Sequence, residues 1–432
     1  MSIYYRRIKS INAPREFLGR TIYVSNHANS FMDPLVVASF RLPIVFFMVR
    51  ADIYKGVMKS IFWASHMFPI YRQQDGGDTK ALNDGVFAKC TRVLKYGRNL
   101  LIFGEGFTDD VFVRRLKPIK KGAVRIGFAT LESMNWKKKI YIAAVGCNYS
   151  APSKMRSDLL ISGSDKICLN DYREAYEENP NKVITELTKK IEVLMQDQIT
   201  HIEDKQFGPL HENIMSVTRK GIHGKSYDEK LSLVKRWKYS QKLAKWINGH
   251  EGDNAKPLID LSDKLKSYFE RLEKLNLEDH LVYWKLKNSS GSRIKEIMYC
   301  ILLFPFMLIG FIHCSIPYII TKRFVEKSFK REVFHGSVKM MMGKILTGLF
   351  NIPVIFLIYY LVYPSWWVSI AYYFTIGLTG LAAYMWFKHL AAFKNKGIMN
   401  KSNLDEIIAE RNSLEKLIDE LLPEFTTSHE SK

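Results

Sequence analysis

The sequence has few cysteines, and their spacing fits neither a disulfide framework nor a zinc site. Five cysteines occur in 432 residues. None forms a Cys-x-x-Cys pair or stands at metal-ligand spacing from a histidine. This excludes a small disulfide-rich domain and a structural zinc module. We therefore expect free thiols, buried or in a membrane and in a reducing compartment, and no metal site.

Acidic residues are also scarce. The chain has 64 Lys and Arg against 43 Asp and Glu, a formal net charge of +21. Such an excess favours a polyanionic partner, either nucleic acid or the anionic surface of a membrane. No signature of DNA or RNA recognition occurs, so we expect no nucleic acid partner. The basic N-terminal residues include no apolar run, so we expect no cleavable signal peptide.

Charge is absent altogether from two long stretches. Residues 297–320 and residues 345–387 contain no Asp, Glu, Lys or Arg. The first is long enough to cross a bilayer once, and the second predicts a two-pass hairpin that turns near residues 364–365. Pro305 and Pro317 leave open whether the first segment crosses or re-enters the membrane. Basic residues on both sides leave its orientation open.

Between Thr21 and about residue 170, apolar runs of strand length alternate with helical patterns. A helix over 79–96, ended by Gly97, is the clearest of these patterns. This alternation predicts an α/β fold with a mainly parallel sheet flanked by helices. The expected strands are 21–24, 44–49, 99–103 and 140–145.

The composition changes along the chain predict four regions. The first twenty residues, basic with aromatics, are expected either on a membrane surface or as a solvated start of the fold. Helices are expected at 180–200, 226–248 and 258–286. An amphipathic helix after Ser402 suits docking or pairing. The regions are a catalytic domain (1–170), a helical extension (171–295), a membrane-embedded region of one Pro-broken segment plus the hairpin (296–390) and an amphipathic tail (391–432).

The stretch Ser25–Leu35 gathers polar side chains directly after a strand-like run. It contains His27 and, six residues later, Asp33. Imidazole titrates near neutrality, and a carboxylate on its far nitrogen fixes the tautomer that accepts a substrate proton. The sequence therefore predicts a His–Asp pair for proton transfer, with Asn26 and Asn29 beside it. The alternative is that Asp33 only caps the next helix.

Three later stretches complete a pattern with this one. They are Phe68–Arg72, Ile102–Thr108 and Ala143–Tyr149. In order and spacing the four stretches resemble the motif blocks of the PlsC-like glycerolipid acyltransferase family: a His-Asp motif, a block ending in Arg, a Phe-Pro-Glu-Gly block and a Val-Pro block. The form His-Ala-Asn-x-Phe-x-Asp-Pro is similar to the branch of fungal-type glycerol-3-phosphate acyltransferases. The resemblance covers roughly residues 1–170.

The chain departs from the family pattern at three points. Asp33 stands six residues after His27, where five is common in the family. Gly104 replaces the usual proline of the third block, and the fourth block has no proline.

The resemblance implies transfer of a fatty acyl group from acyl-CoA or acyl carrier protein to glycerol-3-phosphate or 1-acylglycerol-3-phosphate. His27 would be the general base and Asp33 would hold its ring, with no enzyme nucleophile, metal or cofactor. The resemblance assigns Arg72 and the Glu105–Gly106 turn to the phosphorylated acceptor. Glu105 would accept hydrogen bonds from glycerol hydroxyls, or instead form an ion pair with a nearby basic residue.

The remaining expectations concern partners and location. Asn26 and Asn29 are expected to bind substrate. Six basic residues within 114–125 predict either a phosphate-attracting rim or a solvated face. We expect a membrane protein with its catalytic domain on the cytoplasmic face. Two alternatives stay open: the same fold acting on another lysophospholipid or an aminoacyl lipid, and a non-enzymatic membrane-binding relative.

Overall fold

The structure, a computed structural model, describes most of the chain. The described residues are 3–13, 18–39, 45–54, 56–71, 79–250, 255–287, 291–401 and 404–422. They fall into two compact units. The sheet unit comprises residues 7–152 and 158–205, and the helical unit comprises residues 1–6, 153–157 and 206–432.

The sheet unit is built on one sheet, which has eight strands in the described part of the chain. The strands are β1 (Arg7–Ile11), β2 (Thr21–Ser25), β3 (Val45–Arg50), β4 (Met67–Ile70), β5 (Asn99–Phe103), β6 (Tyr141–Tyr149), β7 (Asp158–Gly163) and β8 (Ile167–Cys168). Their order is β1-β7-β6-β2-β5-β3-β4, and β8 pairs with β6. Only the pairings of β6 with β7 and β8 are antiparallel, so the predicted mainly parallel sheet is confirmed.

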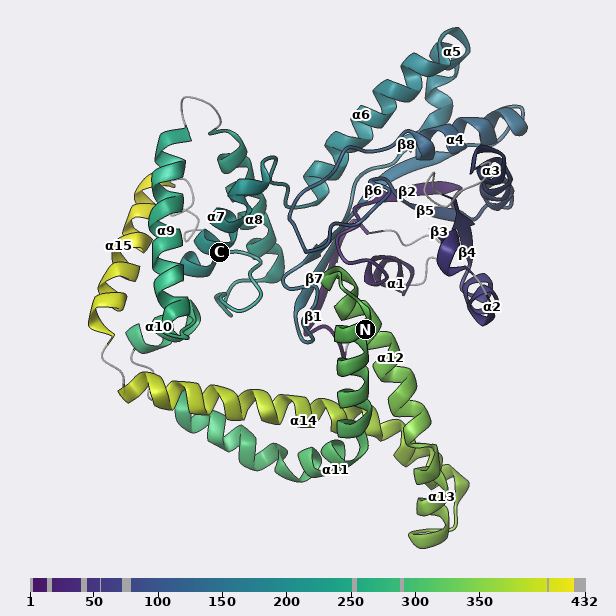
Figure 1. Ribbon diagram of the computed structural model, residues 1–432. Coiled ribbons are helices and arrows are strands. Elements are labelled where there is room, and N and C mark those ends of the chain that lie inside the picture. Colours follow the sequence, from purple (N-terminus) through teal and green to yellow (C-terminus); the bar gives the residue numbers. More distant parts are fainter. Residues whose placement is uncertain are drawn as a thin grey trace. The chain divides into compact units, whose positions relative to one another are not determined.

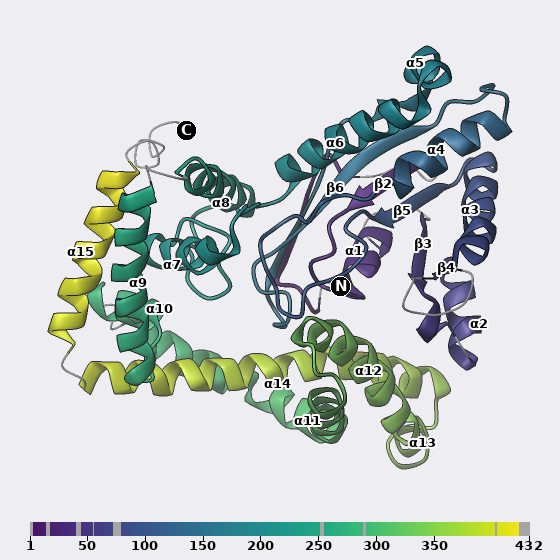
Figure 2. The same ribbon diagram turned by 45° about the horizontal axis from the view of Figure 1, so that its top comes forward.

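Helices cover both faces of this sheet. Ile22 and Val24 of the central strand β2 point into the main core, where α3, α4 and α6 pack against them. The shorter helix α1 lies on the opposite face (Figure 2). The helices of this unit are α1 (Met32–Ser39), α2 (Val57–Ala64), α3 (Thr79–Lys95), α4 (Gly122–Ser133), α5 (Arg173–Glu178) and α6 (Pro180–Gln198).

Two edge strands differ from the sequence-based expectations. β1 lies where we expected a surface segment or a solvated start, and it pairs in parallel with β7. β4 contains Pro69, which has no N–H to give to a neighbour. Both strands lie at the edges of the sheet. A proline is tolerated in an edge strand because one side of that strand has no neighbour to receive a hydrogen bond.

The helical unit contains a bundle of helices, seen at the left of Figure 1. They are α7 (Gly208–Thr218), α8 (Leu233–Asn248), α9 (Lys256–Lys274), α10 (Asp279–Leu286) and α15 (Asp405–Leu421). Arg411 of α15 is fully buried, and its Nε atom donates to Asp279 Oδ1 of α10 over 2.9 Å. Of the two uses expected for this tail helix, the structure shows docking.

The same unit holds the apolar segments. They form α11 (Gly291–Ser328), α12 (His335–Phe350), α13 (Ile352–Leu361) and α14 (Trp366–Lys401). α11 and α14 run antiparallel, since Glu296 contacts His389 and His313 contacts Tyr372. Among the described residues, three helical stretches are long and apolar enough to cross a membrane: Arg293–Ser328, Glu332–Leu361 and Trp366–Met399.

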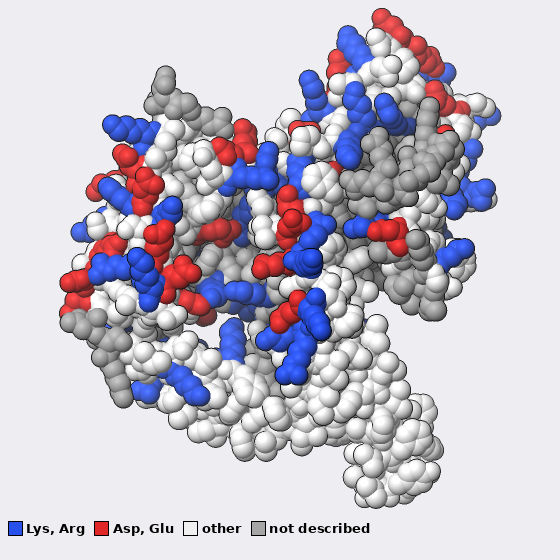
Figure 3. Space-filling view, in the orientation of Figure 1, with Lys and Arg blue, Asp and Glu red and all other residues white. Residues whose placement is uncertain are grey.

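The surface of these helices is mostly apolar and exposed. Trp367 is 83% exposed and Leu361 is 77% exposed. In Figure 3 the region around α13 is almost entirely uncharged. An apolar surface of this extent is typical of contact with lipid rather than water, so the chain associates with membranes. α13 ends at Leu361 and α14 begins at Trp366, so a helix break lies where the sequence predicted a turn; the two-pass hairpin stays a prediction.

Candidate active site

The parallel pairing of β2 with β5 brings two motif blocks together. Ser25 pairs with Phe103 at the ends of these strands. His27 and Glu105 each lie two residues beyond, at the carboxyl edge where ligands of parallel sheets gather. The backbone N–H of His27 donates to Glu105 Oε1 over 2.8 Å. The third block therefore supports the main chain of the first.

His27 and Asp33 form the predicted pair. His27 Nδ1 lies 3.0 Å from Asp33 Oδ2, and the ring of Phe103 stacks on the imidazole at 4.2 Å. Asp33 is completely buried, whereas the His27 side chain is 21% exposed. With its proton on Nδ1 facing the carboxylate, the imidazole has a basic Nε2 for a substrate proton.

The turn between His27 and Asp33 explains how a carboxylate six residues after the histidine can reach its ring. Ser30 adopts a positive φ of 45°, and the N–H of Met32 donates to the carbonyl of Asn29. This tight turn starts α1 and returns Asp33 to the imidazole. Asp33 Oδ2 also accepts from the backbone N–H of Asn29 over 2.8 Å. The carboxylate therefore both caps the local chain and orients His27.

Tyr149 is a site residue that the sequence analysis missed. Its hydroxyl donates to Asp33 Oδ1 over 2.7 Å, and the side chain is fully buried. Each carboxylate oxygen of Asp33 thus receives at least one hydrogen bond. In the sequence, only the position of Tyr149 at the end of the fourth block pointed to the site, and that position does not show where the side chain points.

The two asparagines of the first block are both buried. Asn26 pairs with the backbone of Cys147, donating from Nδ2 to its carbonyl and accepting at Oδ1 from its N–H. This pairing fastens the end of β2 to β6. Asn29 Nδ2 donates to the carbonyl of Pro152, and its Oδ1 has no partner among the described residues. Substrate binding by either residue stays a prediction.

Glycine is required at both positions of the third block. Gly106 has a φ of +78°, and a Cβ there would lie 2.8 Å from Lys120 Nζ. The N–H of Gly104 donates to the carbonyl of Ser25. A proline at position 104 could not donate this bond, and a Cβ would meet Val24 at 2.8 Å. The packing here accounts for the departure from the family pattern.

Glu105 is buried and forms the ion pair that the sequence left as an alternative. Its Oε2 lies 3.7 Å from Lys117 Nζ, and its side chain is 3% exposed. Burial raises the pKa of the Glu105 carboxyl, while the His27 N–H and the Lys117 ammonium act to lower it. The hydroxyl-binding role of Glu105 and Gly106 stays a prediction.

The basic run 114–125 divides into two kinds of residue. Arg114 and Lys117 are buried, and Arg114 donates to the carbonyl of Tyr149 over 3.0 Å. Lys120 and Lys121 are exposed, as a phosphate-attracting rim requires. Arg72 lies outside the described residues, so its phosphate-binding role stays a prediction.

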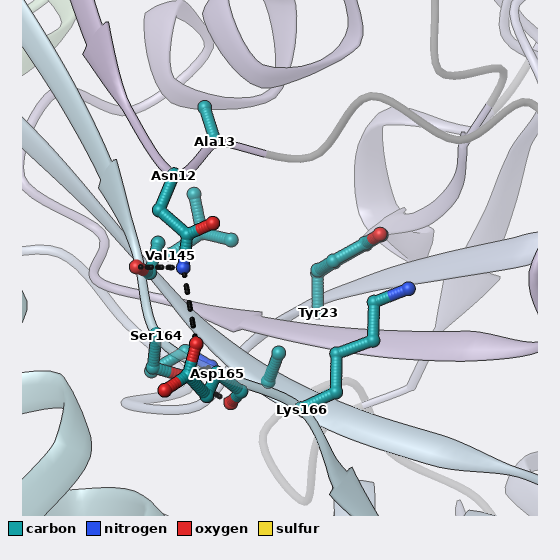
Figure 4. A pocket seen from close by; sticks show the side chains of 10 residues that line it. Asn12, Ala13, Tyr23, Val145, Ser164, Asp165 and Lys166 are labelled. Carbon is teal, nitrogen blue, oxygen red and sulfur yellow. Dashed lines mark hydrogen bonds between the residues drawn. The ribbon is translucent and has the colours of Figure 1, made fainter.

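A cleft of about 450 Å³ lies elsewhere in the sheet unit. In Figure 4 the side chain of Asn12 makes hydrogen bonds beside it, to the Gly163 carbonyl and to Asp165. None of the described residues that line it is a predicted site residue, although Ala143, Ala144 and Val145 come from the fourth block. The cleft is therefore separate from the His27–Asp33 pair, and a catalytic role for His27 stays a prediction.

His27 and Asp33 form an imidazole–carboxylate pair at the carboxyl edge of a mainly parallel sheet, an arrangement suited to taking a proton from a substrate hydroxyl. Residues 7–148 match the acyltransferase family model. The chain therefore contains an acyltransferase domain and is an acyltransferase enzyme. The matched range contains His27, Asp33, Arg72 and Glu105.

One solved structure is also similar in part. It is the crystal structure of the 1-acyl-sn-glycerophosphate (LPA) acyltransferase, PlsC, from Thermotoga maritima, at 13% sequence identity and a TM-score of 0.30. The similarity covers 44% of this chain and 71% of that chain. A search of curated proteins gave no match.

Proposed function

We propose that this protein moves a fatty acyl group from acyl-CoA or acyl carrier protein to glycerol-3-phosphate or 1-acylglycerol-3-phosphate, in the synthesis of phosphatidic acid and phospholipids. The observation that carries the proposal is the 3.0 Å contact of His27 with a fully buried Asp33, inside a domain of acyltransferase type. The membrane helices of the same chain support a lipid product.

The chemistry needs no enzyme nucleophile. His27 Nε2 takes the proton of the acceptor hydroxyl while the hydroxyl oxygen attacks the thioester carbonyl. The new ester C–O bond forms, the C–S bond breaks, and the imidazolium returns the proton to the departing thiolate. Asp33 stabilises the imidazolium between these steps. Arg72 would hold the acceptor phosphate as a bidentate fork.

We further propose that the catalytic domain lies on the cytoplasmic face of the membrane. Arg293 and Lys295 precede the first apolar segment, and Lys322 and Arg323 follow it. Positive residues near membrane segments favour the cytoplasmic side, which supports placing there the flank at Arg293 and Lys295 that precedes the first apolar segment. A maleimide reagent that cannot cross membranes, applied to intact vesicles of known orientation, tests the sidedness.

The test of the reaction is an activity panel. Purified protein receives a radiolabelled acyl donor, as acyl-CoA or acyl carrier protein, with glycerol-3-phosphate or its 1-acyl form as acceptor. We expect His27→Ala to lower turnover by about a hundredfold or more, because a general base contributes that much. Turnover above about a tenth of wild type would refute the mechanism.

A second acceptor class is retained as an alternative, since the same geometry serves any acceptor hydroxyl or amine. Lysophospholipids and aminoacyl lipids in the same panel decide this point. The family match and the assembled His27–Asp33 pair stand against a non-enzymatic relative.

A further inference from the structure

Lys117 is a buried cation directly behind Glu105. Its Nζ atom lies 3.7 Å from Glu105 Oε2 and 3.1 Å from Asp109 Oδ2, and it donates to the carbonyl of Phe107 over 3.0 Å. The side chain is only 10% exposed. Burying an ammonium group is costly unless it is paired. The partners of Lys117 therefore stabilise its buried charge in this loop.

Glu105 connects this cation to the general base. One carboxylate oxygen, Oε2, faces Lys117, while the other, Oε1, accepts from the backbone N–H of His27. The backbone N–H of Lys117 also acts to lower the pKa of Glu105. Because these groups surround a nearly fully buried carboxylate, Glu105 is placed to act on the main chain of His27.

We propose that Lys117 and Glu105 form a positioning pair for His27: the ammonium pairs with one carboxylate oxygen, and the other oxygen fixes the backbone from which the imidazole projects. This inference rests on the proposed function and concerns the same site. It gives Glu105 a role through His27 and not through the acceptor hydroxyls. It also gives a lysine of the basic run a function other than attracting phosphate.

The charges around Glu105 determine the expected pH dependence. The other titratable groups in this environment are His27, Lys117, its partner Asp109, and Lys120, which packs against Gly106. Burial raises the pKa of Glu105, and Lys117 opposes that rise. Without Lys117 the pKa rises further, so Glu105 takes up its proton at a higher pH. A protonated Glu105 is a weaker acceptor for the His27 N–H. As the pH is lowered, the activity of a variant without Lys117 should therefore begin to fall at a higher pH than that of wild type.

The primary experiment replaces Lys117 by methionine, which has a similar length and no charge. At neutral pH we expect kcat to fall about tenfold or more, since hydrogen bonds to charged groups contribute on that scale, with both KM values changed by less than about twofold. The acid limb of the kcat/KM profile should move to higher pH. Lys117→Arg should restore both properties, and Lys189→Met, an exposed lysine on α6, is the matched control.

A second set of variants separates positioning from acceptor binding. Glu105→Gln keeps an oxygen for the His27 N–H but cannot ionise. In that background Lys117→Met should cause no further shift of the acid limb. A rise in the KM of the glycerol acceptor alone, with kcat unchanged, would place the pair at the acceptor and overturn the proposal. An unchanged kcat and pH profile in Lys117→Met would overturn it as well.

A third measurement does not depend on activity. Hydrogen–deuterium exchange of the full chain in detergent reports the His27 amide, which should exchange faster in Lys117→Met than in wild type or Lys189→Met. Equal protection overturns the positioning pair. If wild type transfers acyl groups to neither glycerol acceptor, the proposed function fails, and the exchange result still decides the pair. Lys117→Gln serves the same purpose if the methionine variant does not fold.

Discussion

At the residue scale, Asp33 receives three hydrogen bonds, and the one from Tyr149 can be removed with the least other change. Tyr149→Phe deletes a hydroxyl that donates over 2.7 Å to Asp33 Oδ1. A hydrogen bond to a charged group contributes about 1.5–3 kcal/mol, which corresponds to a tenfold or larger loss of kcat if Asp33 then holds the imidazole poorly. Both KM values should change little, because Tyr149 contacts no substrate in the proposed mechanism.

Steady-state kinetics on the purified variant checks this prediction. Tyr141→Phe, at the other end of β6, is the matched control, since the Tyr141 ring lies beneath the Lys166 ammonium and not beside Asp33. Wild-type kcat in Tyr149→Phe at every pH would show that two donors are enough to hold Asp33.

The His27–Asp33 pair could be predicted because both residues lie in one short motif, and a carboxylate near an imidazole has few uses at a strand end. Tyr149 could not, because it lies 116 residues from Asp33 in sequence and only the pairing of β2 with β6 brings them together. Lys117 was expected to be exposed, either on a phosphate-attracting rim or on a solvated face, because charge runs are usually solvated. Its burial depends on Asp109 and Glu105, which no local pattern reveals.

At the element scale, the docking of α15 depends on a buried guanidinium. Arg411 donates to Asp279 and Glu415, each over 2.9 Å, and to the carbonyl of Val217. Arg411→Met leaves the Asp279 carboxylate, which also accepts from Tyr268, buried without its cation. Breaking a buried pair in this way costs about 3–5 kcal/mol, so we expect a clear fall in the thermal midpoint of the helical unit.

Thermal unfolding of the full chain in detergent, followed by circular dichroism, measures this effect. Glu406→Gln is the control. Glu406 lies on α15, as Arg411 does, but it is 85% exposed and pairs with Arg271 of α9 at the surface. Exposed ion pairs add little to stability, so that variant should unfold like wild type. Equal midpoints for both variants would show that α15 is held by its apolar face alone.

The boundaries of the bundle helices show what periodicity does and does not predict. A helix over 226–248 was expected, but α8 starts only at Leu233, where the Ser232 side chain accepts from the N–H of Lys235 as an N-cap. The predicted helix over 258–286 is two helices, α9 and α10. Asn276, at a positive φ of 51°, breaks it. The apolar pattern continues through this break, so periodicity alone could not place it.

At the scale of the whole molecule, membrane association follows from apolar surface that the rest of the described chain leaves uncovered. The apolar windows of the three candidate spans are only 6–17% buried. The sequence predicted these segments well, because an uncharged run of this length is rare in water-soluble proteins. It did not predict Asn351 between α12 and α13, where the side chain lies 2.7 Å from His313 Nδ1 and binds the His313 carbonyl. Polar pairs across apolar helices of this kind are visible only once the helices are packed.

The membrane prediction concerns how the protein leaves a bilayer. Its net charge of +21 alone would hold it to anionic lipids by contacts that salt screens within a Debye length of about 10 Å at moderate ionic strength. Embedded helices instead stay in the bilayer because about twenty apolar residues each match its hydrocarbon core. We therefore expect the full chain to remain in the membrane pellet after washes with high salt and with alkaline carbonate, and to dissolve only in detergent. Immunoblotting of pellet and supernatant measures the distribution, with a peripheral basic protein as the control that salt releases. Release of this chain by carbonate would mean that α11 to α14 cover an unseen protein partner and not lipid.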